Sequence, residues 1–242
     1  MNEIKGYEKY YLNILLTYLD IEPEKIIFTE SPDFKIIVNK QKIGIELTRI
    51  FNETGNPPLQ AIEGDYNKIT NYVNQKLLKT KLPPLEVYLL FSQNPIPRLK
   101  SKKEIGNKIF KLIKRNVPDK NKYIAIKNDF ENDDIIPYEL SNINIANFPV
   151  LEKHFVNTSS FGWVNKVFSD LIQSIIKKKE IKLRKYDKTC IKFWLLIHTG
   201  GYSGASMFEP SNETISHNYS SKFNKVFFMD NFEKKVYSLK IN

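Results

Sequence analysis

Two carboxylates, Asp33 and Glu46, lie in a stretch of the chain that is predicted to form two short strands. Asp33 follows Pro32 at the beginning of one strand, and Glu46 lies inside the next with an apolar residue on each side. The acids are 13 positions apart with a polar turn at 39–41 near the midpoint, so a hairpin would bring them close together. Burying a carboxylate is costly unless its charge is compensated. Two such groups, with a carbonyl and waters, form a hard oxygen site for Mg²⁺ or Mn²⁺.

The elements around this pair predict an α/β fold. An amphipathic helix at 7–19 precedes three short strands, and a second helix and a buried strand follow them. This order is typical of a mixed sheet flanked by helices. The remaining periodicity predicts further elements, of which the helix at 163–186 is the clearest. The predicted helices are 7–19, 59–78, 102–116 and 163–186, and the strands are 25–29, 34–38, 42–48, 85–91, 122–127, 143–148, 193–198, 225–230 and 234–240.

The motif around the two acids resembles that of the PD-(D/E)XK nuclease superfamily. Its members carry Pro-Asp and then Glu-x-Lys on neighbouring strands between two helices, and Pro32-Asp33 and Glu46-Leu47-Thr48 occupy those positions here, with Gly44 just before the glutamate. The match covers about residues 7–91. The resemblance implies a restriction-endonuclease-like mixed sheet, in which Asp33 and Glu46 bind Mg²⁺ (or Mn²⁺) for phosphodiester hydrolysis. It also implies that the backbone carbonyl of Leu47 is a further metal ligand.

Thr48 departs from this motif, because it stands where the superfamily has its catalytic lysine. The apolar stripe of the predicted helix at 163–186, extended by one turn, places Lys179 and Lys182 on the face that should point to the core. These lysines and the apolar strand after them resemble the tail of Glu-x-Thr variants of the superfamily. Either lysine, with Lys182 slightly favoured, could then stabilise the charge of the transition state. The alternative is that the helix has reached solvent, where lysine is common.

Glu8 is a further candidate, because many members of this superfamily supply an additional acid from their first helix. It lies near the start of the predicted helix, three residues before Tyr11 on the apolar face. An ordinary glutamate that favours the helix dipole is the equally acceptable interpretation.

The charge of +10 and the pI near 9.3 favour a nucleic-acid partner, with DNA preferred over RNA. A Lys-, Asn- and Ile-rich composition also follows from AT-rich coding DNA without any binding function. The single cysteine, Cys190, excludes a disulfide framework and a multi-cysteine zinc site. With no signal-peptide pattern and no apolar run long enough to span a bilayer, we expect a cytoplasmic protein without a membrane partner.

We expect a single domain over residues 1–242, with its core at about 1–92 plus 163–198 and an additional C-terminal hairpin. The sequence leaves open whether a homodimer makes paired cuts. It also leaves a second functional class, in which Thr48 marks a catalytically degenerate nuclease fold that serves as a nucleic-acid or protein-binding module.

Overall fold

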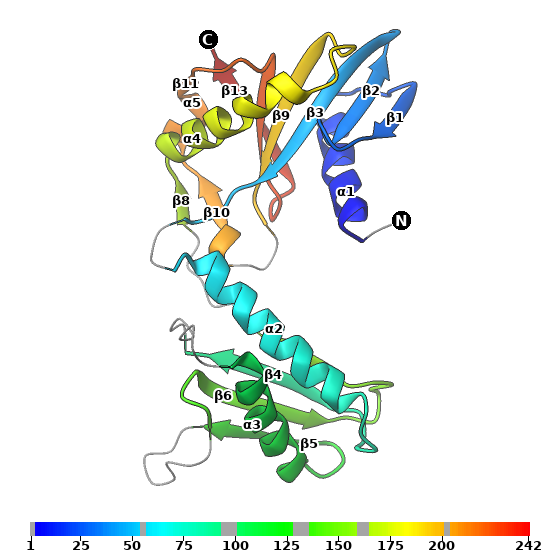
Figure 1. The fold of residues 1–242 in the computed structure, drawn as a ribbon, viewed down its shortest axis with the longest axis vertical. Helices are drawn as coiled ribbons and strands as arrows, with labels where there is room; N and C mark the ends of the chain where they lie inside the picture. Colours follow the sequence, from blue (N-terminus) through cyan, green and yellow to red (C-terminus); the bar gives the residue numbers. More distant parts are fainter. Residues whose placement is uncertain (1–2, 54–56, 93–100, 128–135, 159–164, 201–203) are drawn as a thin grey trace. The chain divides into compact units, whose positions relative to one another are not determined.

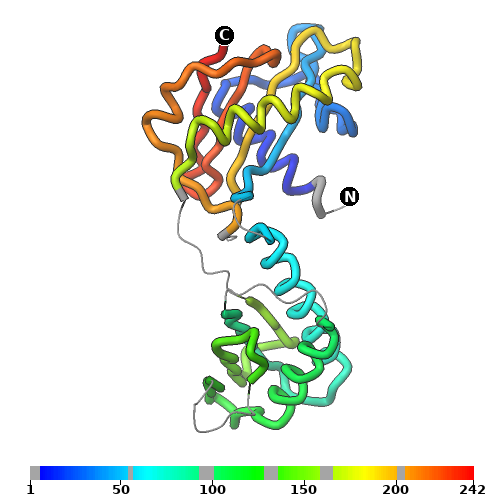
Figure 2. Tube along the Cα trace, turned by 60° about the vertical axis from the view of Figure 1, so that its left-hand side comes forward, coloured from blue at the N-terminus to red at the C-terminus, as the bar shows by residue number. Residues whose placement is uncertain are grey.

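The computed structural model describes residues 3–53, 57–92, 101–127, 136–158, 165–200 and 204–242. The chain forms two compact units, where the sequence led us to expect one domain. Unit 1 contains Met1–Phe51, Trp163–Tyr202 and Ser206–Asn242, and unit 2 contains Asn52–Gly162 with Ser203–Ala205. The chain therefore leaves unit 1 after Phe51 and returns to it at Trp163 (Figure 2).

Unit 1 is built on a seven-stranded mixed sheet, as the predicted order of elements suggested (Figure 1). The first three strands are antiparallel neighbours, and β3, β9 and β12 run parallel at the centre. The last hairpin, β12–β13, continues the sheet, so it belongs to the core of unit 1. In sheet order the strands are β1 (Lys25–Phe28), β2 (Phe34–Val38), β3 (Gln41–Arg49), β9 (Lys192–His198), β12 (Lys225–Asp230), β13 (Lys235–Ile241) and β11 (Asn218–Tyr219).

One helix covers each face of this sheet. Successive side chains of a strand point to opposite faces, so β3 sends Ile45 and Leu47 to one core and leaves Glu46 on the other face. The first core is closed by α1 (Glu3–Tyr18). The second core, which contains Leu195 and Ile197 of β9, is closed by α4 (Ser169–Glu180). Glu46 therefore points to the side of the sheet that α4 covers.

The helix predicted at 163–186 is shorter than expected. Asn165–Val167 forms strand β8, which pairs with β10 (Phe208–Pro210), and α4 begins only at Ser169. The apolar residues Val167 and Phe168 fitted the helical period but do not belong to the helix: Val167 is buried in strand β8, and Phe168 is 69% exposed. At the other end, Ile181–Lys185 forms a 3₁₀ turn (η1), and a short helix α5 (Asn212–Ser216) precedes β11.

Unit 2 has its own sheet and its own core. Its strands lie in the order β5 (Lys122–Lys127), β6 (Leu140–Asn147), β4 (Glu86–Phe91) and β7 (Phe155–Thr158). The helices α2 (Leu59–Leu77) and α3 (Lys102–Arg115) bury their apolar faces with these strands in one cluster. The helix and strand that the sequence placed in the same core as Asp33 and Glu46 thus belong to unit 2. No helix among the described residues has the length and apolar character needed to cross a membrane.

Candidate functional site

The β2–β3 hairpin brings the two predicted carboxylates together at its open end. Phe34 pairs with Ile45 and Lys35 with Gly44, and the same register continued by one residue sets Asp33 opposite Glu46. The Oδ2 atom of Asp33 accepts a hydrogen bond of 2.7 Å from the backbone N–H of Leu47, the residue after Glu46. The predicted hairpin and its turn are therefore confirmed.

Gly44 lets the chain before β2 pack closely on β3. A Cβ atom at this position would lie 2.6 Å from Cδ1 of Phe193 and 2.8 Å from Cγ of Pro32. Only a residue without a side chain allows both rings to approach the strand so closely. Gly44 thus helps to place Asp33, the residue that follows Pro32.

Glu46 is 3% exposed, and two lysines from the α4 side compensate its charge. The Nζ atom of Lys179 lies 2.8 Å from Oε1 of Glu46, and that of Lys182 lies 3.7 Å from the same oxygen. The side chain of Lys179 is 17% exposed, whereas that of Lys182 is 56% exposed. The structure therefore brings both predicted lysines to the carboxylate, with Lys179 and not Lys182 in the closer contact.

Lys179 also reaches the backbone. Its ammonium group donates to the carbonyl oxygen of Leu47 at 3.4 Å, so Glu46 Oε1 and Leu47 O face the same cation. Thr48 is half-buried and lies on the same strand face as Glu46, two residues further along.

Asp33 has a pKa that is raised to about 6. Burial is the largest cause, and the negative charge of Glu46 is the second, while the N–H of Leu47 and the charge of Lys179 oppose the shift. Glu8 on α1 raises the pKa of Asp33 slightly further, so this predicted acid lies within electrostatic reach of the pair. A bound divalent cation would relieve the repulsion that the charge of Glu46 exerts on the ionised form of Asp33.

Tyr186 is a buried site residue that the sequence reasoning did not select. Burial, followed by the charge of Glu46, raises the pKa of its hydroxyl, which stays protonated. Its ring packs against Phe193 with centroids 5.3 Å apart. It follows Lys182 by one turn on the predicted inward face, and this spacing was the available signal.

His198 and Arg49 lie side by side at the ends of the parallel strands β9 and β3. The ring of His198 stacks on Tyr11 of α1 at 4.1 Å, and Arg49 Nε donates to Ser206 Oγ at 2.8 Å. Burial is the main cause that lowers the pKa of His198 to about 4; the charges of Arg49 and Lys179 add to the shift, and the hydrogen bond to the backbone of Thr199 opposes it. His198 is therefore neutral at physiological pH, and it lies on the face of the sheet that α1 covers.

The oxygen atoms of this site fit a hard divalent cation. Glu46 Oε1 and Leu47 O already converge on one positive charge, and Asp33 is bonded to the amide of the same Leu47. Within the described ranges, no group of three or more His, Cys, Asp and Glu residues is arranged to hold a metal ion. The oxygen groups that could be offered to a cation here are two carboxylates and one carbonyl, and Mg²⁺ commonly adds several waters to such ligands.

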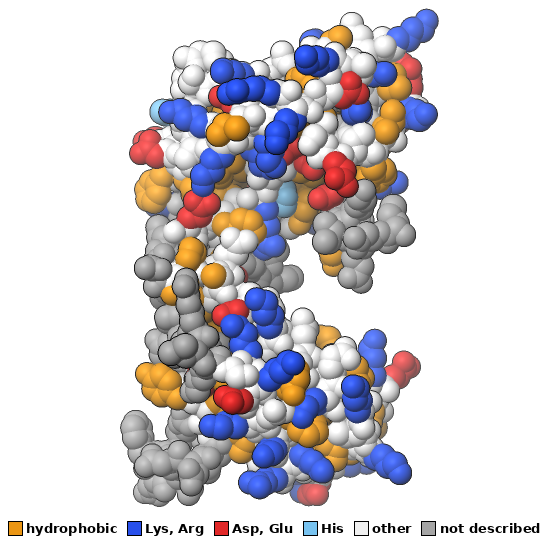
Figure 3. Space-filling view, in the orientation of Figure 1, with side chains coloured by type: hydrophobic (Ala, Val, Ile, Leu, Met, Phe, Trp, Pro, Cys, Tyr) orange, Lys and Arg blue, Asp and Glu red, His pale blue; other side chains and the backbone are white. Residues whose placement is uncertain are grey.

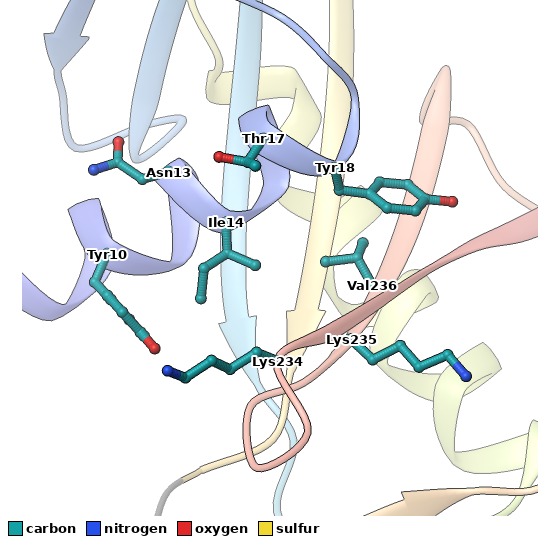
Figure 4. Close-up of a pocket in the computed structure, with 8 residues that line it drawn as sticks. All are labelled: Tyr10, Asn13, Ile14, Thr17, Tyr18, Lys234, Lys235 and Val236. Atoms are coloured by element: carbon teal, nitrogen blue, oxygen red, sulfur yellow. The ribbon is translucent and has the colours of Figure 1, made fainter.

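A pocket in unit 1 is separate from these residues. It has a volume of about 530 Å³ and lies between α1 and the beginning of β13, where Tyr10, Tyr18, Lys234 and Lys235 line it (Figure 4). No carboxylate and none of the candidate site residues line this pocket.

No protein-family model, curated protein or solved structure matches the chain.

Proposed function

We propose that the chain is a metal-dependent nuclease that hydrolyses phosphodiester bonds of nucleic acid, with DNA as the preferred substrate. In this proposal unit 1 is a restriction-endonuclease-like domain of the PD-(D/E)XK type, and unit 2 is an insertion in it. The observation that carries the proposal is the meeting of Asp33, Glu46 and Lys179 around the backbone of Leu47.

Each residue has a role in this proposal. Asp33, Glu46 and the carbonyl of Leu47 hold Mg²⁺ (or Mn²⁺), which when bound supplies an activated water for hydrolysis. Lys179 takes the place of the lysine that is missing at position 48 and stabilises negative charge that develops on the phosphate oxygens. Lys182 supports it from a more exposed position, and Glu8 serves as the additional acid of the first helix.

A second candidate function rests on the same ion pair. Since Lys179 already compensates the buried charge of Glu46, the fold has no electrostatic need for a metal ion. With Thr48 in the motif, this favours a catalytically degenerate domain that binds nucleic acid or protein. The two candidates differ in whether the chain cleaves.

The test is cleavage of labelled DNA and RNA, single- and double-stranded, in Mg²⁺ or Mn²⁺. We expect metal-dependent cleavage by the wild type and a loss of at least about 100-fold in Asp33→Ala and in Glu46→Ala. Asp119→Ala, which removes an exposed carboxylate in unit 2, is the matched control and should keep full activity. Cleavage that survives both substitutions would contradict the proposed site, and a wild type that cleaves none of these substrates would favour the binding module.

A further inference from the structure

The exposed face of α3 in unit 2 concentrates positive charge. This helix of 14 residues contains six basic residues and one acid, Glu104. Five of the six basic side chains are exposed, and Figure 3 shows Lys and Arg over the part of unit 2 that Figure 1 labels α3. The exposed five are Lys103, Lys108, Lys111, Lys114 and Arg115.

The described residues of unit 2 do not compensate this charge. Lys102, at the first turn of α3, forms an ion pair of 3.2 Å with Asp65 of α2. Within the described part of the chain, no carboxylate lies within ion-pair distance of the five exposed cations. Such a surface attracts a polyanion, because bringing negative charge to it displaces only water and small ions.

The face is held rigidly by contacts with α2. A Cβ atom at Gly106 would lie 2.6 Å from Cδ1 of Tyr72, so the two helices approach closely there. Tyr72 donates from its hydroxyl to Oδ1 of Asn107 at 3.0 Å, and Lys76 donates to the same oxygen at 2.6 Å. The exposed cations are therefore presented by a helix whose rotation is determined by its neighbour.

Burial of the opposite face argues against a lipid surface as the partner. The apolar residues Ile105, Ile109 and Ile113 are at most 1% exposed in the core of unit 2. A helix that binds at a membrane surface needs its apolar face free to enter the lipid. α3 therefore offers charge without an apolar anchor, which fits a polyanion in water.

The spacing of the cations fits a linear polyanion. At a rise of about 1.5 Å per residue, the span from Lys103 to Arg115 is roughly 18 Å along the helix. One strand of duplex DNA carries a phosphate about every 3.4 Å along its axis, so this span covers roughly five phosphates. Lysines that reach phosphates read no base sequence.

We propose that the exposed face of α3 binds the phosphate backbone of nucleic acid without sequence preference. This inference shares its partner class with the proposed function, but it requires neither metal nor cleavage. It assigns unit 2 a role in holding the substrate, in addition to the reaction proposed for unit 1.

The test is fluorescence anisotropy of a labelled DNA duplex with the full chain, in EDTA and over a series of salt concentrations. The variant carries Lys108→Gln, Lys111→Gln and Lys114→Gln. Each lost phosphate contact should reduce the slope of log K against log salt by about 0.9, so we expect a slope shallower by roughly 2 to 3. At about 0.1 M salt we expect at least tenfold weaker binding.

A matched variant removes the same charge from unit 1, through Lys25→Gln, Lys222→Gln and Lys240→Gln at exposed positions. It should change affinity by less than about threefold, and replacing the three α3 lysines by arginine should preserve binding. Equal losses in both glutamine variants would overturn the proposal, as would a wild type that does not bind. Because this assay contains EDTA and measures binding alone, failure of the proposed nuclease site would be seen separately, in the cleavage assay.

Discussion

The ammonium group of Lys179 lies 2.8 Å from Oε1 of Glu46, although 133 residues separate the two in the chain. The contact joins the last turn of α4 to the middle of β3, across the insertion that forms unit 2. Glu46 is 3% exposed, so burying its carboxylate without a partner would be costly. The ion pair with Lys179 offsets this cost.

Replacing Lys179 by alanine should destabilise the metal-free chain. Among the described cations, the substitution leaves Lys182 at 3.7 Å as the ion-pair partner of Glu46, so we expect the free energy of unfolding to fall by about 2 kcal/mol. Lys182→Ala is the matched control and should cost less than about 1 kcal/mol, since this side chain is mostly in solvent. Urea unfolding in EDTA measures both values. Equal losses in the two variants would show that the 2.8 Å contact carries no special weight.

A lysine at position 48 should replace Lys179 in catalysis. Thr48 lies on the face of β3 that carries Glu46, so a lysine there could reach the same carboxylate and the substrate phosphate. We expect Lys179→Met to reduce cleavage by at least about 100-fold, and the added Thr48→Lys to restore a measurable part of it. Adding Thr48→Arg instead is a control for charge alone. If Thr48→Lys restores no cleavage, the result would argue against the proposal that Lys179 on α4 replaces a catalytic lysine at position 48 on β3.

The sequence located the hairpin and its acids because both depend on local features. A 13-residue separation with a turn at its centre determines which residues face each other, so Asp33 and Glu46 could be paired without any long-range information. Lys179 and Lys182 were also found, because the apolar period of α4 extends past Ile176 onto the inward face.

The division into two units could not be predicted in this way. The hydrophobic periodicity of helix α2 and strand β4 shows that each has a buried face. It does not show which sheet that face packs against. The order of elements led us to expect that α2 and β4 share one core with the β2–β3 hairpin. In the structure, α2 and β4 bury their side chains with α3 instead. The helical spacing placed Tyr186 on the inward face, but its contact with Phe193 and the influence of Glu46 on its hydroxyl are brought about only by the folded chain.

The stability of the metal-free chain should depend on the ionisation of Asp33. Folding raises its pKa from an ordinary value near 4 to about 6, so the folded state holds this proton more tightly than the unfolded state. The contribution is therefore present below about pH 4 and is lost as the pH rises through about 6. Relative to Asp33→Asn, the wild type should lose stability across this window, measured by thermal unfolding in EDTA. A difference that stays constant, or that grows with pH, would contradict the assigned environment.

Gly44→Ala should destabilise unit 1 through overpacking. The added Cβ would meet Phe193 and Pro32 at 2.6–2.8 Å, and relieving this contact should cost about 1–3 kcal/mol. Gly64→Ala is the control, because Gly64 lies within α2 and no atom comes within 4 Å of its added Cβ. That substitution should stabilise the chain by about 0.4–1 kcal/mol. Denaturant unfolding measures both, and a neutral Gly44→Ala would show that Pro32 can move away freely.

Calorimetric titration with Mn²⁺ tests most directly whether Asp33 and Glu46 form a metal site. The variants are Asp33→Asn and Glu46→Gln, which keep the side-chain shapes, with Asp119→Asn as a control at an exposed carboxylate. We predict that the wild type and the control bind Mn²⁺ and that each site variant loses more than about tenfold in affinity. A wild type that does not bind Mn²⁺, or site variants that bind it as well as the control does, would contradict the account.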